Sequence, residues 1–586
     1  MKIIKYLLTI IVLGILSCSD DFLDRTPLDE VSNETFFSNE NDIVNYNNSL
    51  YDIAKNDRDY PIMMGLGPGP GVLFYHGIWW QDEMSDNLGA THPRAIEMYR
   101  VRAGKHNIDN DPRPMGYTGW DFIRSINFGL ENYDRAGLSE EIVNRYKGEA
   151  RLFRGWFYSD KVRRFGDVQW IDKVLNIDSE ELFNPRDNRD FVMQKVLEDL
   201  DFAIAGLPED WENGGNPGRV DKWVALAVKS RVCLFEGTWR KYHGLSNADF
   251  WLEQCVVASK ELMDNGGFTL YSTGDPVGDY RYASSSTTQE GNSEVIYWRK
   301  YESLINGHFA SRLFWNYNGG ATKSFVEDVL CEDGLPISLS PLYAGDAQIE
   351  DVFVARDSRL RQCVLNPADK ELLNYPNDDF DYPRLVGMTG GRNRSNTGYH
   401  VVKHWNAEDE QRPRNQHIAS PPCLRLGEVF LNFAEAKAEL GTLTQGDLDI
   451  SINLLRSRVN MPGLDINPPM DPRYADMGVS SLIVEIRRER RVELFLEGHR
   501  YHDVRRWKQG PRFFGQSDFG IRFDAAAEAR YEGANVEITE IDGIPYIDVR
   551  KDTDFIPEFD ESRHYLWPIP ANVISQNPNI QQNPGW

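Results

Sequence analysis

Apolar side chains recur at spacings of three and four residues over long stretches of this chain, and this period constrains its fold more than any other feature. The spacing gathers apolar residues on one face of a helix, so each stretch predicts an amphipathic α-helix. The predicted helices cover residues 120–136, 141–164, 187–205, 222–239 and 248–264. In the second of them Leu152, Phe153, Trp156 and Phe157 form the predicted buried stripe, and Gly166 follows the expected helix end.

The predicted helices come in neighbouring pairs. Small residues in the fourth and fifth helices would let the two approach closely, as in antiparallel hairpins stacked side by side: Ala225, Ala227, Gly237 and Ala258. A tetratricopeptide-like array fits this pattern, although its full consensus is not found at a fixed period. Helical spacing returns near the other end of the chain, over 424–440, 448–458 and 481–496. A mainly helical scaffold built from both ends of the chain is therefore expected.

Between residues 266 and 422 Gly, Pro, Asn, Asp and Ser become frequent and helical spacing becomes scarce. A short strand is predicted within 294–301 and a short helix within 324–330. A second loop-rich stretch covers 61–114. Because long loops in compact proteins usually carry function, we expect the ligand site to be built there.

The first residues have the pattern of an export signal. Lys2 and Lys5 precede an apolar run over 6–16, and Ser17 and Cys18 follow it. The run is too short for a permanent membrane-spanning helix, which needs about 20 residues. The pattern is similar to a bacterial lipoprotein signal, with residues 1–17 removed and acyl chains added to Cys18. An ordinary secretory signal with an incidental cysteine is the alternative.

Composition excludes one class of partner. The chain of 586 residues carries 90 acidic against 64 basic residues, a formal net charge of -26. Such a surface repels a phosphate backbone, so no nucleic acid is expected as a partner. The remaining cysteines have no metal-binding or disulfide-framework spacing and are expected to be mostly buried thiols: Cys233, Cys255, Cys331, Cys363 and Cys423.

Several motifs occur in one order from the first cysteine to the last residue. After Cys18 come Glu149-Ala150-Arg151-Leu152-Phe153-Arg154-Gly155, Arg164-Phe165-Gly166-Asp167, Gly218-Arg219-Val220 and Arg425-Leu426-Gly427-Glu428-Val429. Arg487-Arg488-Glu489-Arg490-Arg491-Val492-Glu493-Leu494, Glu497-Gly498-His499-Arg500-Tyr501 and Trp567-Pro568-Ile569-Pro570 follow, and Asn577 to Trp586 closes the chain. Together these motifs cover nearly the whole chain. In them the chain resembles the SusD/RagB family of nutrient-binding outer-membrane lipoproteins.

The resemblance implies a mainly α fold, with four pairs of tetratricopeptide-like helices, a large irregular ligand-binding face and a few short strands. The expected organisation is a signal peptide over 1–17 and a SusD-like domain over 18–586. Its helical scaffold would cover about 18–265 and 423–586, and its loop-rich subdomain about 266–422. The implied role is to capture a polymeric nutrient on the outside of a Gram-negative cell and pass it to a SusC-like TonB-dependent transporter.

A glycan site needs exposed aromatic rings for stacking and polar side chains for hydrogen bonds. Two clusters have this composition and are predicted to contact ligand. The first contains Tyr75, Trp79, Trp80, Asp82 and Asn87, and the second contains Trp298, Trp315, Tyr317 and Asn318. For any one of these rings, packing in the core is an alternative of equal weight.

Clustered charges over 485–497 invite a catalytic interpretation, but their spacing favours a structural ion network. Arg490 with Glu493, and Glu485 with Arg488, are spaced to pair along one helix. His499, His502 and Asp503 lack a further ligand at a recognised spacing, so no metal and no cofactor are predicted. The tail from 567 onward is rich in Pro and Asn and is predicted to be extended rather than helical.

The sequence favours a binding protein over an enzyme, and two alternatives stay open. One is a polysaccharide-degrading enzyme in which Asp82 or Glu83 works with a distant carboxylate. The other is a helical-repeat scaffold that holds a peptide in a concave groove.

Overall fold

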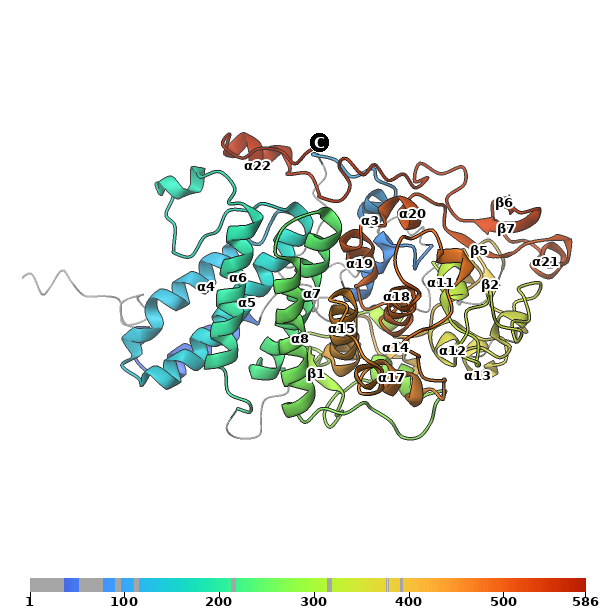
Figure 1. Cartoon of the computed structure of the whole chain (residues 1–586), viewed down its shortest axis with the longest axis horizontal. Coiled ribbons are helices and arrows are strands. Elements are labelled where there is room, and N and C mark those ends of the chain that lie inside the picture. The colour runs from blue at the N-terminus through green and yellow to red at the C-terminus, as the bar shows by residue number, and fades with distance from the viewer. Residues whose placement is uncertain are drawn as a thin grey trace, which may run out of the picture.

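The computed structural model describes residues 36–51, 77–89, 96–109, 115–211, 218–312, 319–375, 377, 379–389 and 394–586. Over these residues the protein is mainly helical, with a few short strands (Figure 1). Long helices occupy one half of the view, and the other half consists of loops and short elements. The prediction of a mainly α fold is therefore confirmed.

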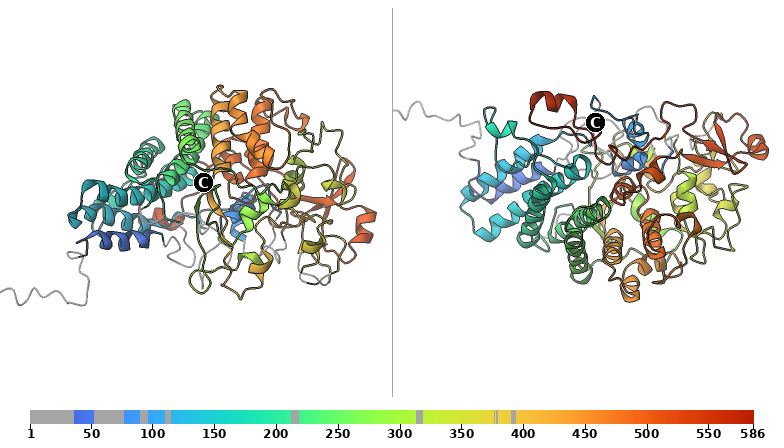
Figure 2. Two further views of the ribbon diagram at one scale, coloured as in Figure 1. Left: turned by 90° about the horizontal axis from the view of Figure 1, so that it is seen from below. Right: turned by 45° about the horizontal axis from the view of Figure 1, so that its top comes forward.

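The predicted amphipathic helices pack as hairpins. α5 (Glu140–Phe165) packs along α6 (Arg189–Gly206), and α7 (Lys222–His243) packs along α8 (Ala248–Asn265). Gly237 allows close approach in the second pair, because a Cβ atom there would lie 2.7 Å from Cγ of Leu252 on α8. The pairs stand side by side in Figure 2, which gives the tetratricopeptide-like arrangement.

Polar residues fix the helix ends. Ser139, Asn188 and Asp221 cap the N-termini of α5, α6 and α7, each accepting a hydrogen bond from a backbone N–H of the first turn. α5 ends at Gly166, whose φ of 72° is readily adopted by glycine. The predicted glycine stop is confirmed.

The scaffold continues with helices from the far end of the chain. α15 (Leu426–Glu439) packs on α7 and α8, and α18 (Ser481–Glu493) packs on α15. The prediction of a single helix over 448–458 is wrong. The structure has two helices there, α16 (Gln445–Asp449) and α17 (Ile452–Arg458), because the backbone of Ser451 leaves the helical region with φ -138° and ψ -98°.

The buried apolar side chains form two clusters. The first lies within the helical half and contains Phe153 of α5, Leu200 of α6 and Leu252 of α8. The second lies in the loop-rich half and joins Trp79 and Trp80 to Phe325, Val402 and Ile547. The second cluster therefore depends on segments from the beginning, middle and end of the chain.

Short strands tie these distant segments together. β1 (Val295–Trp298) pairs antiparallel with β4 (Pro422–Arg425), which joins the two ends of the loop-rich stretch. β2 (Arg384–Leu385) pairs parallel with β3 (Arg394–Ser395). β5 (Phe519–Arg522), β7 (Ile544–Asp548) and β6 (Ile538–Ile541) form an antiparallel sheet in that order. This late sheet was not predicted, and it packs beside the loop-rich half, although the sequence assigned 423–586 to the helical scaffold.

The C-terminal tail from residue 567 lies along the top of the helical half in Figure 1, where α22 is labelled. Trp567 is fully buried, and the indole N–H of Trp586 donates to the carbonyl of Leu566 at 2.9 Å. The prediction that the tail contains no helix is wrong, because α22 (Ala571–Gln576) forms after Pro570. Proline is tolerated at a helix start, where its missing N–H is not needed.

Shorter helices complete the described chain. They are α2 (Glu40–Leu50), η2 (Ile78–Met84), α3 (Ile96–Arg102), α4 (Trp120–Asn132), η4 (Tyr133–Ala136), η5 (Glu180–Phe183), α9 (Asp279–Ser285), α11 (Lys323–Asp328), η6 (Asp351–Phe353), α12 (Arg359–Cys363), α13 (Lys370–Leu373), α14 (Ala407–Glu410), η7 (Pro472–Tyr474), α19 (Arg500–Arg506), α20 (Gly510–Phe514) and α21 (Ala525–Arg530). Among the helices of the described ranges, none has the length and apolar character needed to span a bilayer.

The cysteines are mostly buried, as predicted. The buried free thiols are those of Cys233, Cys255, Cys331 and Cys363, and Cys423 is half-buried.

Candidate functional site

The fold joins the end of the first predicted cluster to the segment that begins at Gly320. Leu88, at the end of the first cluster, forms an antiparallel bridge with Ala321, which follows the second. Beside this bridge the N–H of Gly89 donates to the carbonyl of Gly320 at 2.9 Å. The N–H of Thr322 donates to the carbonyl of Asn87 at 3.0 Å. Segments more than two hundred residues apart in the chain therefore meet at the edge of the second core.

The individual side chains predicted to bind ligand are not accessible where they are described. Trp79 and Trp80 stack on each other with ring centroids 4.5 Å apart, and both are fully buried. Asp82 and Asn87 are 0% and 1% exposed, and Trp298 is 4% exposed. A sugar cannot stack on these rings in this arrangement, because the second core uses the apolar faces that the prediction gave to a ligand. Cys18, Tyr75, Trp315, Tyr317 and Asn318 lie outside the described residues.

An open pocket of about 580 Å³ lies next to the bridge. Asp86 and Thr322, which flank the bridge, are part of its wall. Its remaining walls come from α3, α11, η7, α20, the loop after α20 and the sheet of β5, β6 and β7. The residues are Arg102, Lys323, Ser324, Glu327, Arg473, Tyr474, Arg512, Phe513, Gln516, Ser517, Asp518, Phe519, Ile541, Asp542, Ile544 and Tyr546. Aromatic rings among charged and hydroxyl side chains are the combination that a saccharide site requires.

Contacts around the pocket hold its aromatic rings in place. The hydroxyl of Tyr474 donates to Asp328 at 2.5 Å, and the hydroxyl of Tyr546, whose side chain is itself buried, donates to Asp346 at 2.8 Å. The Arg512 guanidinium lies 5.3 Å from the Tyr474 ring centroid, within the range of a cation–π contact. Rings fixed in this way lose little conformational entropy when a ligand binds.

Charge pairing keeps the buried carboxylate of Asp86 in this wall ionised. Burial alone would raise the pKa of Asp86, but Arg491 and Arg500 outweigh it and hold that pKa below its ordinary value. Arg491 lies 2.8 Å from one carboxylate oxygen of Asp86, and Arg500 lies 2.8 Å from the other. A general acid needs the opposite shift, so Asp86 is suited to structure and hydrogen bonding rather than to proton donation.

The carboxylates proposed for the enzyme alternative lie in the core instead. Burial raises the pKa of Asp82 to about 7 and the pKa of Glu83 well above its ordinary value. Both side chains have no exposed surface, and neither lines the pocket. Their raised pKa values therefore reflect desolvation within the core, and a polysaccharide has no access to them.

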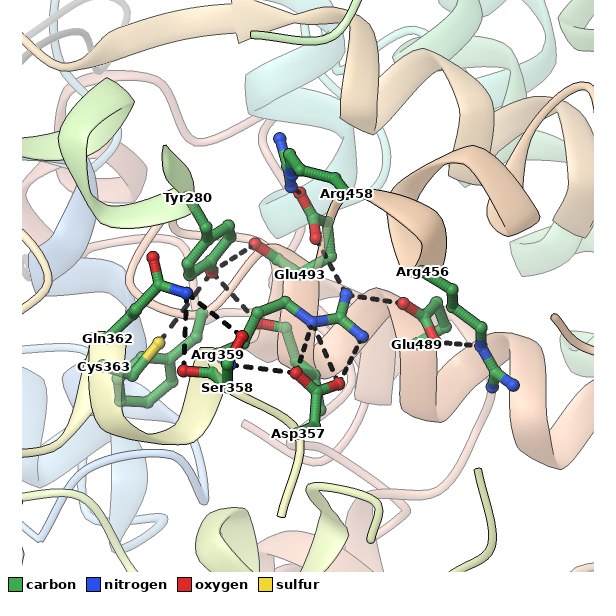
Figure 3. A network of polar contacts seen from close by, with 12 residues as sticks. Tyr280, Asp357, Ser358, Arg359, Gln362, Cys363, Arg456, Arg458, Glu489 and Glu493 are labelled. Carbon is green, nitrogen blue, oxygen red and sulfur yellow. Dashed lines mark hydrogen bonds and ion pairs between the residues drawn. The ribbon is translucent and has the colours of Figure 1, made fainter. Parts of the chain in front are cut away.

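The charged helix α18 takes part in an ion network, as predicted (Figure 3). One of the two predicted ion pairs along it was assigned wrongly. Arg488 pairs with Glu485 at 3.2 Å as predicted. Arg490 pairs with Asp503 at 2.8 Å rather than with Glu493. Glu493 is instead bound by arginines from other segments, namely Arg425 at 2.7 Å, Arg458 at 2.5 Å and Arg359 at 2.9 Å. Helical spacing cannot reveal such partners because they are brought together by tertiary contacts.

The histidines near this helix have protein partners. His502 lies 3.1 Å from Oε1 of Gln81, and burial lowers the pKa of His499 well below its ordinary value. Within the described ranges, no group of three or more His, Cys, Asp or Glu side chains is arranged to hold a metal ion.

Sequence reasoning missed most of the pocket-lining residues. Arg473, Tyr474, Arg512 and Phe513 come from two short helices that have no strong sequence signal. The one available hint was that each pair places an arginine directly before an aromatic residue.

Family models match most of the chain. The model described as "SusD family" matches residues 279–586, and a second, described as "Starch-binding associating with outer membrane", matches residues 77–234. The first of these covers more than half of the chain. The chain belongs to the SusD/RagB family.

Relatives and solved structures agree with this membership. The SusD-like protein P25 of Formosa agariphila is 23% identical, over 85% of this chain and 88% of its own length. A SusD-like protein of Bacteroides ovatus is 22% identical, over 97% of this chain and 95% of its own. A SusD-like carbohydrate-binding protein of Bacteroides fragilis has a TM-score of 0.70 at 22% identity and covers 93% of this chain and 100% of its own. A laminarin-binding SusD-like protein has a TM-score of 0.58 at 17% identity, over 94% of this chain and 100% of its own. These structural likenesses show a shared fold.

Proposed function

We propose that this SusD/RagB family member is a cell-surface lipoprotein that binds a polysaccharide or oligosaccharide and delivers it to a SusC-like TonB-dependent transporter. The observation that carries the binding step is the pocket beside the Leu88–Ala321 bridge, with its fixed aromatic rings and charged rim. The carbohydrate named for relatives and the outer-membrane association named for a matching family model support the ligand class and the location.

Glycan binding is tested by calorimetry with a panel of neutral and acidic glycans and peptides, together with an assay for reaction products. We expect one glycan class to bind and no product to form. Arg512→Ala should weaken binding about tenfold, the effect of losing one charged hydrogen-bond donor. Arg145→Ala, at an exposed ion pair on α5, is the matched control and should leave affinity unchanged. Binding of peptides alone would support the scaffold alternative, and turnover abolished by changing one carboxylate would support the enzyme alternative.

The lipid anchor is tested by the substitution Cys18→Ala. Each buried methylene of an acyl chain contributes about 0.8 kcal/mol to membrane binding, so loss of the acylation site should move the protein to the soluble fraction. Fractionation of cells followed by immunoblotting measures this. A Cys18→Ala protein that still sediments with membranes would refute the anchor.

The transporter partner is tested by purifying the tagged protein from detergent-solubilised outer membranes. We expect a TonB-dependent barrel to co-purify in a fixed ratio, and a retained glycan would identify the ligand. Recovery of the protein alone under several mild detergents would contradict the delivery step.

A further inference from the structure

A second open pocket, of about 540 Å³, lies in the loop-rich half among α9, α12 and α13. Its wall includes Tyr282 and Ser285, the cations Arg281, Arg361 and Lys370, and the carboxylates Asp369 and Glu371. It shares no lining residue with the pocket beside the bridge. It is therefore a separate place where a ligand could be held.

Tyr282 gives this pocket an accessible aromatic ring. The side chain is 53% exposed, and its ring stacks on Tyr271 with centroids 5.2 Å apart and planes at 16°. Asp279 fixes the loop between the two tyrosines, accepting the N–H of Thr273 at 2.7 Å and its hydroxyl at 2.6 Å. The exposed ring is held by a partner ring and a rigid loop, which suits it for stacking on a sugar.

Arg281 gives the pocket a cation without a carboxylate partner. Its Nε donates to the carbonyl of Val402 at 3.0 Å, and its Nη2 donates to the carbonyl of Trp405 at 2.9 Å. No ion pair between described residues involves Arg281, whereas the neighbouring Arg361 pairs with Asp369. Burial lowers the pKa of Arg281 to about 10, which leaves the guanidinium charged at neutral pH.

The Arg281 guanidinium donates to two neutral carbonyls and lies 5.7 Å from the Trp405 ring centroid, and Asp369 acts on it only from beyond ion-pair distance. Such a guanidinium favours an anion in the adjacent space. With three cations against two carboxylates, the wall has a positive formal charge, although the whole chain has a formal net charge of -26. At about 0.15 M salt the Debye length is about 8 Å, so acidic residues far from the pocket are screened.

We propose that this pocket is a second saccharide site that selects an acidic sugar, with Arg281 as the partner of the anion and Tyr282 as the stacking ring. The anion is a carboxylate of a uronic acid or a sulfate ester, which present the same chemistry to a guanidinium. The site extends the proposed function from glycan capture in general to recognition of charged glycans at a distinct place.

The test compares ligands that differ only in charge. The purified full-length protein is titrated by calorimetry with oligogalacturonate and its methyl ester, and with a sulfated galactan and its desulfated form. We expect at least one acidic member to bind about tenfold more tightly than its neutral counterpart, the effect of one charge-assisted hydrogen bond. The pair that shows the preference distinguishes carboxylate from sulfate.

Substitutions assign the preference to this pocket. Arg281→Gln should abolish the preference and Arg281→Lys should restore part of it, whereas Arg145→Gln on α5 should leave it intact. Tyr282→Ala changes an exposed side chain and should weaken binding of the acidic ligand without unfolding the protein. If Arg281→Gln does not fold, Tyr282→Ala decides the question, and unchanged acidic binding in that variant overturns the proposal.

The outcome also separates this proposal from the proposed function. Equal affinity for both members of each pair, with neutral glycans still bound, would refute the acidic site alone. Absence of binding to every glycan would refute both.

Discussion

The helical half and the loop-rich half pair their buried backbone groups in different ways. Helices such as α5 and α7 bond nearly all of their peptide groups internally, so apolar side chains can meet across each hairpin. In the loop-rich half many carbonyls have no helical partner, and buried cations bind them instead. Arg356 donates to the carbonyls of Val326 and Val329, and Lys403 donates to that of Phe495. Irregular backbone can thus be buried where long basic side chains replace the missing hydrogen bonds.

The comparison also explains the concentration of charge on α18. Glu489 and Glu493 balance arginines that reach them from the loop-rich half and from the scaffold, so α18 joins the two regions. A buried charge pair is costly to break because it leaves the remaining charge without a partner in a medium of low polarity.

The largest expected effect comes from breaking this junction. Glu493→Gln removes the charge that three buried arginines share, and we expect the free energy of unfolding to fall by about 3–5 kcal/mol. Chemical denaturation measures the change. The control is Glu198→Gln on α6, whose exposed ion pair with Lys195 should contribute less than about 1 kcal/mol. Equal losses in the two variants would show that α18 is not the junction described.

A smaller effect is expected from acid, and it should appear around buried histidines such as His308. His308 is neutral in the folded protein, donating from Nε2 to the carbonyl of Ala419 and accepting the N–H of Ala310 at Nδ1. Burial lowers its pKa to about 4, and this outweighs the opposing effect of Asp409. The unfolded chain binds the proton near pH 6.5, so stability should decrease as the pH falls from 6.5 to 4, by about 1.4 kcal/mol per unit of pKa difference.

Hydrogen exchange at pH 7 and pH 5 tests this prediction by region. Amides near His308 should lose protection before those of α4, which contains no histidine and packs on α2 and α5. A His308→Gln variant should show a shallower dependence of stability on pH. Simultaneous loss of protection around His308 and in α4 would contradict the proposed difference.

The smallest effect concerns close packing in the helical half. Gly237→Ala places a Cβ atom 2.7 Å from Leu252 Cγ and 2.9 Å from its backbone nitrogen, so α7 and α8 must separate. We expect a loss of about 1–2 kcal/mol, because the strain exceeds the gain in helix propensity. Gly446→Ala in α16 is the matched control: its nearest neighbour atom would be 3.8 Å away, and it should stabilise by up to about 1 kcal/mol. Thermal unfolding of both variants measures the contrast, and a stabilising Gly237→Ala would show that the helices can move apart freely.

The helical half was largely predictable because its signals are local. The apolar stripe of α5, the glycine after it and the small residues of α7 each act within one or two helical turns. The break between α16 and α17 was missed because the conformation of Ser451 depends on its surroundings rather than on apolar spacing. The sheet of β5, β6 and β7 was missed although Asp542-Gly543, which connects β6 to β7, is a hairpin-turn signal in the sequence.

Only part of the candidate site falls in the loop-rich segments that the sequence pointed to, because residues 473–546 supply most of the pocket wall. Loop composition and clustered aromatics pointed to the segments that meet at Leu88 and Ala321. The same aromatics, Trp79 and Trp80, are in the core, since a tryptophan suited to stacking on a sugar is equally suited to packing in protein. The exposed ring of Tyr282 and the unpaired charge of Arg281 carry no sequence signal, because exposure and pairing are properties of neighbours in space.

The sequence by itself determined the helical period, the predicted anchor at Cys18 and the ordered motifs that mark the family. Each of these depends on residues that are close to one another along the chain. The tertiary structure alone decided which charges pair with Glu493, which aromatic rings are buried and where pockets open. Those outcomes depend on contacts among segments hundreds of residues apart, and burial free energy is the sum of such contacts rather than a property of any one residue.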